Sequence, residues 1–240
     1  MNVEFLSLMK NNLIEINPII YKLTNLKNLN LMNNELTYLD SGIANLNNLV
    51  VLNATSNKIL SLPNSFGSLA NLEILQINNN QLTSLPSSFG DLHKLAHLDI
   101  NDNKLSNLPA NFSKLNKLYQ VNLQNNQFVF FPVKLTHLSH LNSIDLNNNQ
   151  ISLLPKEIGN LKNLKILTLS NNKLTSLPKE IAELDKLEML FLTSNSLKKL
   201  PANMGKMKNL KTLMALDNQF SEKEKARIKK MLPLVDVRLE

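Results

Sequence analysis

The sequence predicts an α/β solenoid of about ten stacked repeats, and three observations support this fold class. Asparagine recurs at an unbroken period of 23 residues. Apolar residues stand at fixed offsets from each asparagine, and a proline follows six residues after it in seven of the ten units. Units of this size cannot bury their apolar residues alone, so they must stack on one another. The recurring asparagines are Asn11, Asn34, Asn57, Asn80, Asn103, Asn126, Asn149, Asn172, Asn195 and Asn218.

Each unit follows the pattern LxxLxLxxNxLxxLPxxxxxLxx. The LxL segment alternates with period 2, as expected of a half-buried β-strand. An asparagine amide donates and accepts hydrogen bonds at once, so a column of asparagines can satisfy backbone groups that the turn after each strand leaves facing inward. We therefore expect the ten asparagines to belong to the scaffold.

The pattern resembles the leucine-rich repeat (LRR) family over about residues 3–220, and its asparagine- and lysine-rich style looks bacterial. The resemblance implies a right-handed solenoid curved like a horseshoe, with a parallel β-sheet on the concave face and short helical or irregular segments on the convex face. The recurring apolar residue of the convex segments is expected to stack into a core spine. Its members are Phe66, Phe89, Phe112, Leu135, Ile158, Ile181 and Met204.

The two ends of the chain depart from the pattern, and we expect a single domain over residues 1–240. Residues 221–238 predict a C-terminal cap: an amphipathic helix that begins with a capping box of Ser221 and Glu224, and then a final strand. The basic side chains of this helix are expected to form a solvated face. Residues 239–240 resemble a cloning remnant and are given no weight. The first strand has no cover, so we expect either missing upstream sequence or protection by association.

Composition excludes several classes of protein. The 240 residues include no cysteine, which excludes disulfides and thiolate metal sites, and no apolar run approaches the length of about 18 that a spanning helix needs. We expect no membrane insertion, while the cellular location stays open. The net charge of +7 resides in residues 121–240, yet the concave positions carry four lysines against seven acids. Nucleic acid needs a basic groove, so we expect no nucleic-acid partner.

No group of residues predicts an enzyme, a cofactor or a metal site. Of the four histidines only His97 faces the concave side, and one imidazole beside Asp99 and Asn101 is a weak ligand set. The run that starts at Asp99 resembles a calcium-binding loop. It has Lys104 and Ala110 where such a loop needs glycine and glutamate. We expect no catalytic residues, no cofactor and no bound metal.

Candidate partner-binding residues follow from the strand register, because side chains between the buried leucines must point outward onto the concave face. These candidates are Asn53, Gln76, Asn78, His97, Asp99, Asn101, Asn122, Asp145, Asn147, Ile166, Thr168, Met189, Phe191, Met214 and Leu216. The strongest signal is the apolar group near the C-terminal end of this set, since exposed aromatic and methionine side chains mark interaction surfaces. The alternative is that the C-terminal cap folds over the group and buries it.

A second, smaller apolar patch consists of Val129, Phe130 and Leu153, at positions where most repeats have serine, threonine or asparagine. Local packing between two coils is the alternative explanation of these residues.

As the family resemblance implies, we expect a monomeric, non-enzymatic protein-recognition scaffold that binds a protein partner of unknown identity on its concave face. Two alternatives stay open. The asparagine- and aspartate-rich strip of the concave face could bind glycans or cell wall, although few aromatic side chains are available there to stack on sugars. The chain could also be the recognition domain of a larger signalling protein, such as a kinase- or GTPase-linked protein.

Overall fold

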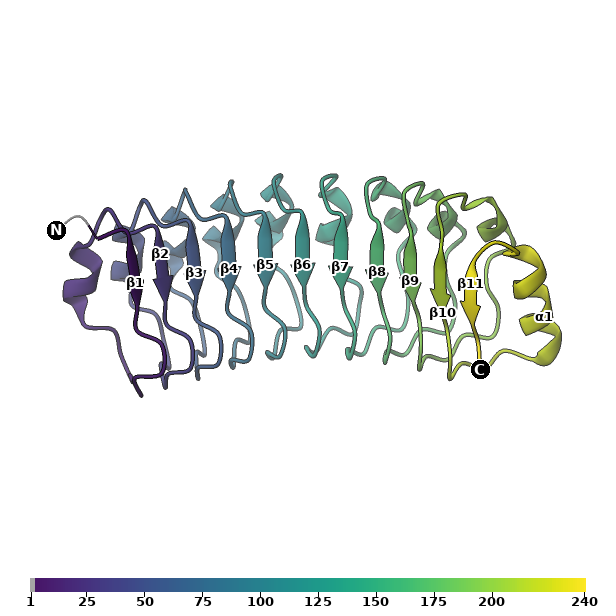
Figure 1. Cartoon of the computed structure of the whole chain (residues 1–240), viewed down its shortest axis with the longest axis horizontal. Helices are drawn as coiled ribbons and strands as arrows, with labels where there is room; N and C mark the ends of the chain where they lie inside the picture. Colours follow the sequence, from purple (N-terminus) through teal and green to yellow (C-terminus); the bar gives the residue numbers. More distant parts are fainter. Residues whose placement is uncertain (1–2) are drawn as a thin grey trace. The chain divides into compact units, whose positions relative to one another are not determined.

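A computed structural model describes residues 3–240 of the protein, which forms two compact units, unit 1 (Met1–Asn122) and unit 2 (Leu123–Glu240). Both units are built from the same coil: a three-residue strand, a sharp corner, an extended edge and a five-residue 3₁₀ helix. Figure 1 shows the strands of each unit side by side, with the 3₁₀ helices behind them. Each unit thus carries the predicted repeat, and a single domain over the whole chain stays a prediction.

Within each unit the strands are parallel, and neighbouring strands, one repeat apart, pair with each other. Unit 1 contains β1 (Phe5–Ser7), β2 (Asn28–Asn30), β3 (Val51–Asn53), β4 (Ile74–Gln76), β5 (His97–Asp99) and β6 (Gln120–Asn122). Unit 2 contains β7 (Ser143–Asp145), β8 (Ile166–Thr168), β9 (Met189–Phe191), β10 (Thr212–Met214) and β11 (Asp236–Arg238). The apolar residue at the centre of each strand points into the core, so the residues on either side of it face solvent.

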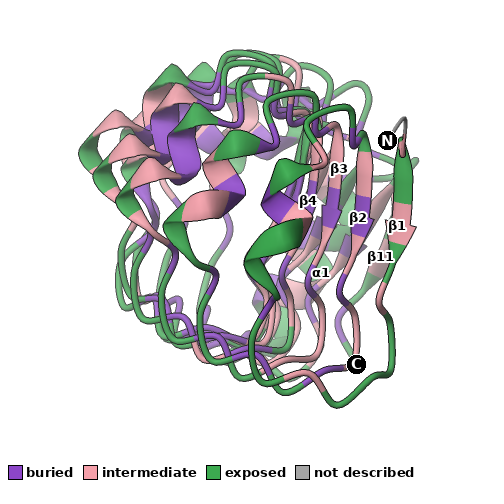
Figure 2. Cartoon of the chain, turned by 90° about the vertical axis from the view of Figure 1, so that its left-hand side faces the viewer, coloured by how far each residue is buried: buried purple, intermediate pink, exposed green. Residues whose placement is uncertain are grey.

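The 3₁₀ helices (η) lie on the side of the coil opposite the strands (Figure 2). They are η1 (Pro18–Lys22), η2 (Ser41–Asn45), η3 (Asn64–Ser68), η4 (Ser87–Asp91), η5 (Ala110–Lys114), η6 (Val133–His137), η7 (Lys156–Asn160), η8 (Lys179–Glu183) and η9 (Ala202–Lys206). The predicted spine is fully buried. In unit 1 the ring of Phe89 stacks between Phe66 and Phe112, with centroids 6.3 and 6.0 Å away.

The recurring asparagines form the predicted ladder, as Asn103 shows. Its Oδ1 accepts a hydrogen bond from the Leu82 N–H at 2.9 Å, and its Nδ2 donates to the carbonyl oxygens of Ile77 and Ile100 at 3.1 Å. One side chain therefore satisfies backbone groups of its own coil and of the preceding coil. Asn11 differs from this pattern, because it is exposed and its Nδ2 donates to the Met9 carbonyl.

The corner of each coil is made by the residue before the ladder asparagine, whose φ lies between 51° and 59°. This left-handed conformation turns the chain so that the asparagine points inward. Asparagine and aspartate tolerate it better than most residues, and they supply most of the corners. The corner residues are Lys10, Asn33, Ser56, Asn79, Asp102, Asn125, Asn148, Asn171, Ser194 and Asp217.

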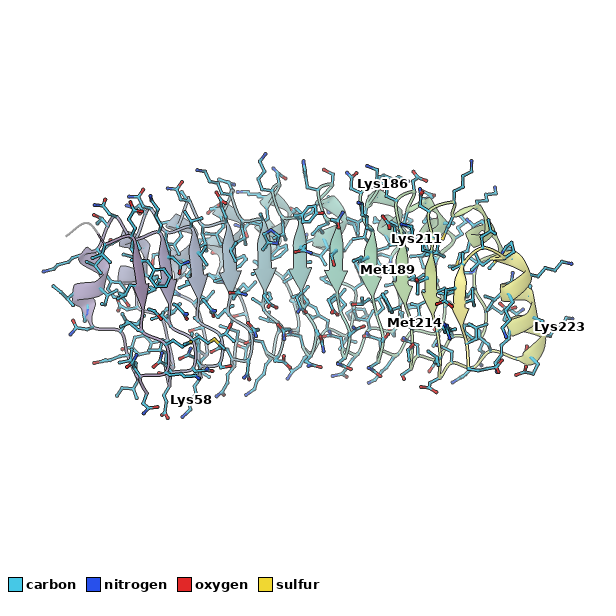
Figure 3. The ribbon with its side chains drawn as sticks, viewed as in Figure 1. Lys58, Lys186, Met189, Lys211, Met214 and Lys223 are labelled. Atoms are coloured by element: carbon cyan, nitrogen blue, oxygen red, sulfur yellow. The ribbon has the colours of Figure 1, made fainter. Side chains whose placement is uncertain are left out.

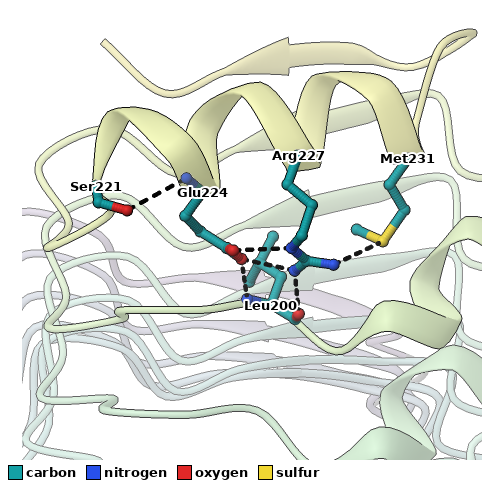
Figure 4. Close-up of polar contacts among 5 residues, drawn as sticks. All are labelled: Leu200, Ser221, Glu224, Arg227 and Met231. Carbon is teal, nitrogen blue, oxygen red and sulfur yellow. Dashed lines mark hydrogen bonds and ion pairs between the residues drawn. The ribbon is translucent and has the colours of Figure 1, made fainter.

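The cap of unit 2 is the helix α1 (Glu222–Met231), and its N-cap Ser221 accepts a hydrogen bond from the Glu224 N–H at 3.2 Å. The predicted reciprocal capping box is wrong in its second half, because the Glu224 carboxylate turns to Leu200 and accepts its N–H at 3.0 Å. Arg227 donates to this carboxylate and to the Leu200 carbonyl, both at 2.6 Å (Figure 4). The ion pair thus satisfies both backbone groups of Leu200, which lies beside the cap.

Two further details of the cap differ from the expectation. Arg227 is half-buried in this ion pair, so the basic side chains of α1 do not all form a solvated face. Leu239 is only 5% exposed and therefore contributes to the core, so the expectation that residues 239–240 carry no weight is wrong for Leu239. The final strand is confirmed as β11, which pairs with β10 and adds a strand to the sheet of unit 2.

The contribution of the cap to the free energy of unfolding is expected to depend on pH, because it includes the Glu224 carboxylate. Hydrogen bonds from Arg227 lower the pKa of the Glu224 carboxyl below its usual value of 4.5, and the Leu200 N–H and the charge of Lys199 act in the same direction. The folded protein therefore gains stability from the ionised carboxylate above pH 4.5 and loses it as the pH falls through the lowered pKa. We expect Glu224→Gln to lower the free energy of unfolding by about 2 kcal/mol at pH 7, with a smaller difference at acidic pH.

Urea denaturation of both proteins at several pH values measures this difference. The matched control is Glu222→Gln, since Glu222 is exposed and pairs with Lys225 on the helix surface. No measurable change is expected for the control. A Glu224→Gln difference that stays constant from pH 7 down to pH 3 would contradict the assignment.

Candidate functional site

The candidate residues lie on the strand face, which we define as the solvent-facing side of the strands and which corresponds to the predicted concave face. The structure buries none of the fifteen side chains: His97 and Met189 are exposed and the others are half-buried. Those from Asn53 to Asn122 belong to unit 1, and those from Asp145 to Leu216 belong to unit 2. The predicted orientation is therefore present in each unit, and the role of these residues in binding stays a proposal.

Several polar candidates of unit 1 already have partners within the protein. Asn53 Oδ1 accepts the Thr55 N–H at 3.0 Å, and the Thr55 hydroxyl donates to Asn78 Oδ1 at 2.6 Å. His97 Nδ1 lies 2.9 Å from Gln120 Oε1. These contacts run along and between neighbouring strands, so the polar strip of unit 1 helps to hold the sheet together.

Unit 2 shows the same arrangement at its polar candidates. Asp145 Oδ1 accepts the Asn147 N–H at 2.9 Å, and Asn147 Oδ1 accepts the Ser170 N–H at 2.7 Å. An aspartate or asparagine that caps the N–H two residues later makes an Asx turn, which ends a strand. Sequence analysis missed this structural role, and the recurring Asn or Asp at the last strand position was the signal for it.

The apolar cluster of unit 2 consists of Ile166, Met189, Phe191, Met214 and Leu216. In the strand register Met189 lies beside Ile166, and Phe191 lies beside Met214. Met189 is 37% exposed and the other four are half-buried, so the cap does not cover the cluster. The alternative that the cap folds over it is wrong, because β11 pairs along the edge of β10 (Figure 3). Cross-strand contacts thus assemble a continuous apolar surface from β8, β9 and β10.

A row of ion pairs borders the apolar cluster, one residue before each strand. Lys165 and Lys211 flank Glu188 at 3.9 and 2.5 Å. The hydrogen bond and charge of Lys211 lower the pKa of Glu188, so this carboxylate stays ionised at neutral pH. On the far side of Met214, β11 places Arg238, which pairs with Asp236 at 2.8 Å. The cluster is therefore an apolar surface with a charged rim.

Within residues 3–240, no three histidine, aspartate or glutamate side chains gather where they could hold a metal ion. Nor does any helix there have the length and apolar character required to cross a membrane.

Comparison with protein families identifies the repeat. A family model described as "Leucine rich repeat" matches residues 70–128, and one described as "Leucine-rich repeat region" matches residues 132–239. Together the matches span more than half of the chain. The chain belongs to the leucine-rich repeat family. A search of curated proteins finds no match for this LRR chain.

Solved structures of LRR proteins share the fold. An LRR protein of Leptospira interrogans is 37% identical, with a TM-score of 0.81 over 98% of this chain and 66% of that chain. The plant peptide hormone receptor RGFR1, solved in complex with RGF2, is 27% identical with a TM-score of 0.83, over 98% of this chain and 39% of the receptor. The Arabidopsis receptor kinase HAESA, in complex with the peptide hormone IDA and the co-receptor SERK1, is 31% identical with a TM-score of 0.78. That match covers 91% of this chain and 39% of HAESA.

The similar structures indicate the general function of the LRR family. LRR proteins similar to this chain are receptors and recognition proteins, and the LRR fold is generally a non-enzymatic binding scaffold. The chain spans about two thirds of the Leptospira protein and less than half of the two plant receptors.

Proposed function

We propose that this LRR chain is a non-enzymatic scaffold that binds a protein or peptide partner on the strand face of unit 2. The observation that carries the proposal is the apolar cluster, which stays accessible beside the cap. A contiguous apolar surface with a polar rim is typical of interaction sites. Phenylalanine supplies a large contact area, and methionine adapts its shape to different partners.

The partner is expected to place apolar side chains against Phe191 and Met214 and polar groups against the charged rim. The similarity to receptors solved with peptide hormones supports a peptide or protein ligand rather than a small molecule. The strands hold the cluster on a fixed framework, so little conformational entropy is lost when a partner binds.

The double substitution Phe191→Ala/Met214→Ala is expected to weaken partner binding by at least about tenfold, because central aromatic and apolar contacts carry most of the energy of an interface. Peptide-display selection against the immobilised protein supplies ligands, and isothermal titration calorimetry compares the variants. The matched control is Phe130→Ala. Phe130 is 74% exposed but lies outside the strand face, so its loss should leave peptide affinity unchanged.

Equal affinity of the double variant and the wild type would reject the apolar cluster as the site. A loss in both the double variant and Phe130→Ala would point to nonspecific apolar adsorption. Thermal melting of each variant checks that the fold is retained.

Glycan recognition is the alternative that the polar strip of unit 1 favours. Tyr119 is 43% exposed there, and its ring lies edge-on to His97 with centroids 6.1 Å apart, so it could stack on a sugar ring. Because Asn53 and Asn78 already have partners in the protein, fewer amides are available for hydroxyl groups. Binding on a glycan array that survives Phe191→Ala/Met214→Ala would favour this alternative.

The wider context of the chain is a further part of the proposal. HAESA is a receptor kinase and is longer than this chain, so a place for the chain within a larger signalling protein stays open. A monomeric state stays a prediction, which light scattering of the purified protein tests.

A further inference from the structure

A second surface of unit 2 lies on the edge that follows the ladder asparagines, away from the strand face. We call it the mixed edge. Its apolar part consists of Val129, Phe130 and Leu153, which are 46%, 74% and 56% exposed. Such exposure contradicts the alternative that these side chains pack between two coils.

The basic part of the mixed edge lies along the same row, three coils after Phe130 and two coils after Leu153. Lys198 and Lys199 occupy the third and fourth positions after Asn195, the positions that Val129 and Phe130 occupy after Asn126. Lys223, in the first turn of α1, adds a further lysine at the capped end of unit 2 (Figure 3). All three lysines are exposed, and within residues 3–240 none of them forms an ion pair with a carboxylate.

Exposed hydroxyl residues, Thr175 and Ser176, separate the apolar part from the basic part. Because these side chains occupy the same repeat positions, they project from one edge at the spacing of neighbouring strands. Three such steps of about 4.8 Å place the coil of Phe130 about 15 Å from the coil of Lys199. A flat surface can therefore touch the apolar, hydroxyl and basic parts at once.

The chemistry of the mixed edge fits the headgroup region of an anionic lipid layer. Aromatic and aliphatic side chains insert at the boundary between headgroups and acyl chains, and lysines are attracted to lipid phosphates. The basic part lies in the unit that holds 18 basic and 11 acidic residues, which attracts a negative surface from a distance. A protein interface would instead place its apolar side chains at a buried centre surrounded by polar groups.

We propose that the mixed edge docks unit 2 on an anionic lipid surface. Phe130 and Leu153 enter the outer part of the lipid layer, and Lys198, Lys199 and Lys223 lie against the phosphates. The attachment is peripheral and leaves the strand face open to a partner. This surface is independent of the apolar cluster, so the two proposals can fail separately.

Co-sedimentation with vesicles tests the docking. Wild type is expected to bind vesicles of phosphatidylcholine with phosphatidylglycerol and not vesicles of phosphatidylcholine alone. Raising the salt concentration to about 0.5 M should weaken the binding, because the screening length of charges falls from about 10 Å at 0.1 M toward about 3 Å at 1 M. Phe130→Ser/Leu153→Ser and Lys198→Glu/Lys199→Glu should each weaken it by about tenfold, in line with the contribution of single apolar groups and lysines at a lipid surface.

Three controls match these variants. Leu60→Ser removes a leucine of similar exposure from unit 1, at the repeat position that Val129 occupies in unit 2. Lys186→Glu/Lys208→Glu makes the same charge change on the turns before β9 and β10. Lys186 projects from the opposite edge in Figure 3. Phe191→Ala/Met214→Ala, which alters the strand face, should also bind vesicles like wild type.

The proposal is overturned if wild type binds neither kind of vesicle, if it binds both equally, or if the lysine control loses as much binding as Lys198→Glu/Lys199→Glu. It is also overturned if the mixed-edge variants lower peptide affinity and leave vesicle binding intact, which would assign this edge to a protein interface. Circular dichroism at the assay temperature checks that each variant is folded, since Lys199→Glu also removes a charge that favours the ionised Glu224.

Discussion

Gly90→Ala is expected to lower the free energy of unfolding by about 3 kcal/mol, although it adds only one methyl group. A Cβ on Gly90 would lie 2.0 Å from the carbonyl oxygen of Asn111 in the next coil. Backbone atoms there must move apart, which also disturbs the stack of Phe89 on Phe112. Urea denaturation, followed by circular dichroism, measures the loss.

Gly159→Ala is the matched control, because both glycines precede a ladder asparagine by 13 residues. A Cβ on Gly159 would meet the flexible Glu183 carboxylate at 3.0 Å and the Glu180 carbonyl at 3.1 Å. We expect a change within about 1 kcal/mol, as for a tolerable contact. Ala182 occupies this position in the next repeat, so the repeat itself accepts a methyl group. Equal losses for the two variants would disprove the steric explanation.

Asn103→Ala is expected to cost about 3 kcal/mol, because it removes the acceptor of the buried Leu82 N–H and one donor to each of the Ile77 and Ile100 carbonyls. Asn103 is only 7% exposed, so water cannot easily replace the amide. Chemical denaturation gives the change, and hydrogen exchange at Leu82 reports the broken bond directly.

Asn107→Ala serves as the comparison for the ladder variant. Asn107 lies four residues later on the exposed edge of the same coil, and its loss should change stability by less than about 0.5 kcal/mol. Similar losses from Asn103→Ala and Asn107→Ala would show that the ladder contributes no more than an exposed amide.

The repeat made most of the fold predictable. The period fixes which leucine is central in each strand, and Leu29 and Leu52 are fully buried in that role. It also fixes the inward-facing asparagines and the convex spine. The outward orientation of the candidate site follows from the same alternation, which is why Met189 and Phe191 lie on the solvent side of β9.

Features that depend on a particular neighbour could not be predicted in this way. Glu224 matches a local capping pattern, but its carboxylate accepts hydrogen bonds from Arg227 and from the Leu200 N–H instead. Leu200 lies 24 residues before Glu224, so a local pattern could not predict this contact. Asp145 faces solvent and also caps a backbone N–H, so orientation alone does not separate binding from structure. Phe130 is 74% exposed, and the period does not predict this exposed ring because most repeats have a small or polar residue at its position.

The reach of the ladder hydrogen bonds has a consequence for how such a protein changes over time. The Asn103 side chain forms hydrogen bonds with backbone groups of Leu82 and Ile77, 21 and 26 residues earlier. Each coil therefore needs its neighbour to have the usual backbone conformation, and no particular side chain. A coil does not depend on the identity of the surface residues on the next one. Segments of 23 residues can therefore be duplicated, lost or exchanged in frame, each carrying its own surface residues, while an insertion of one residue would break the register of the ladder.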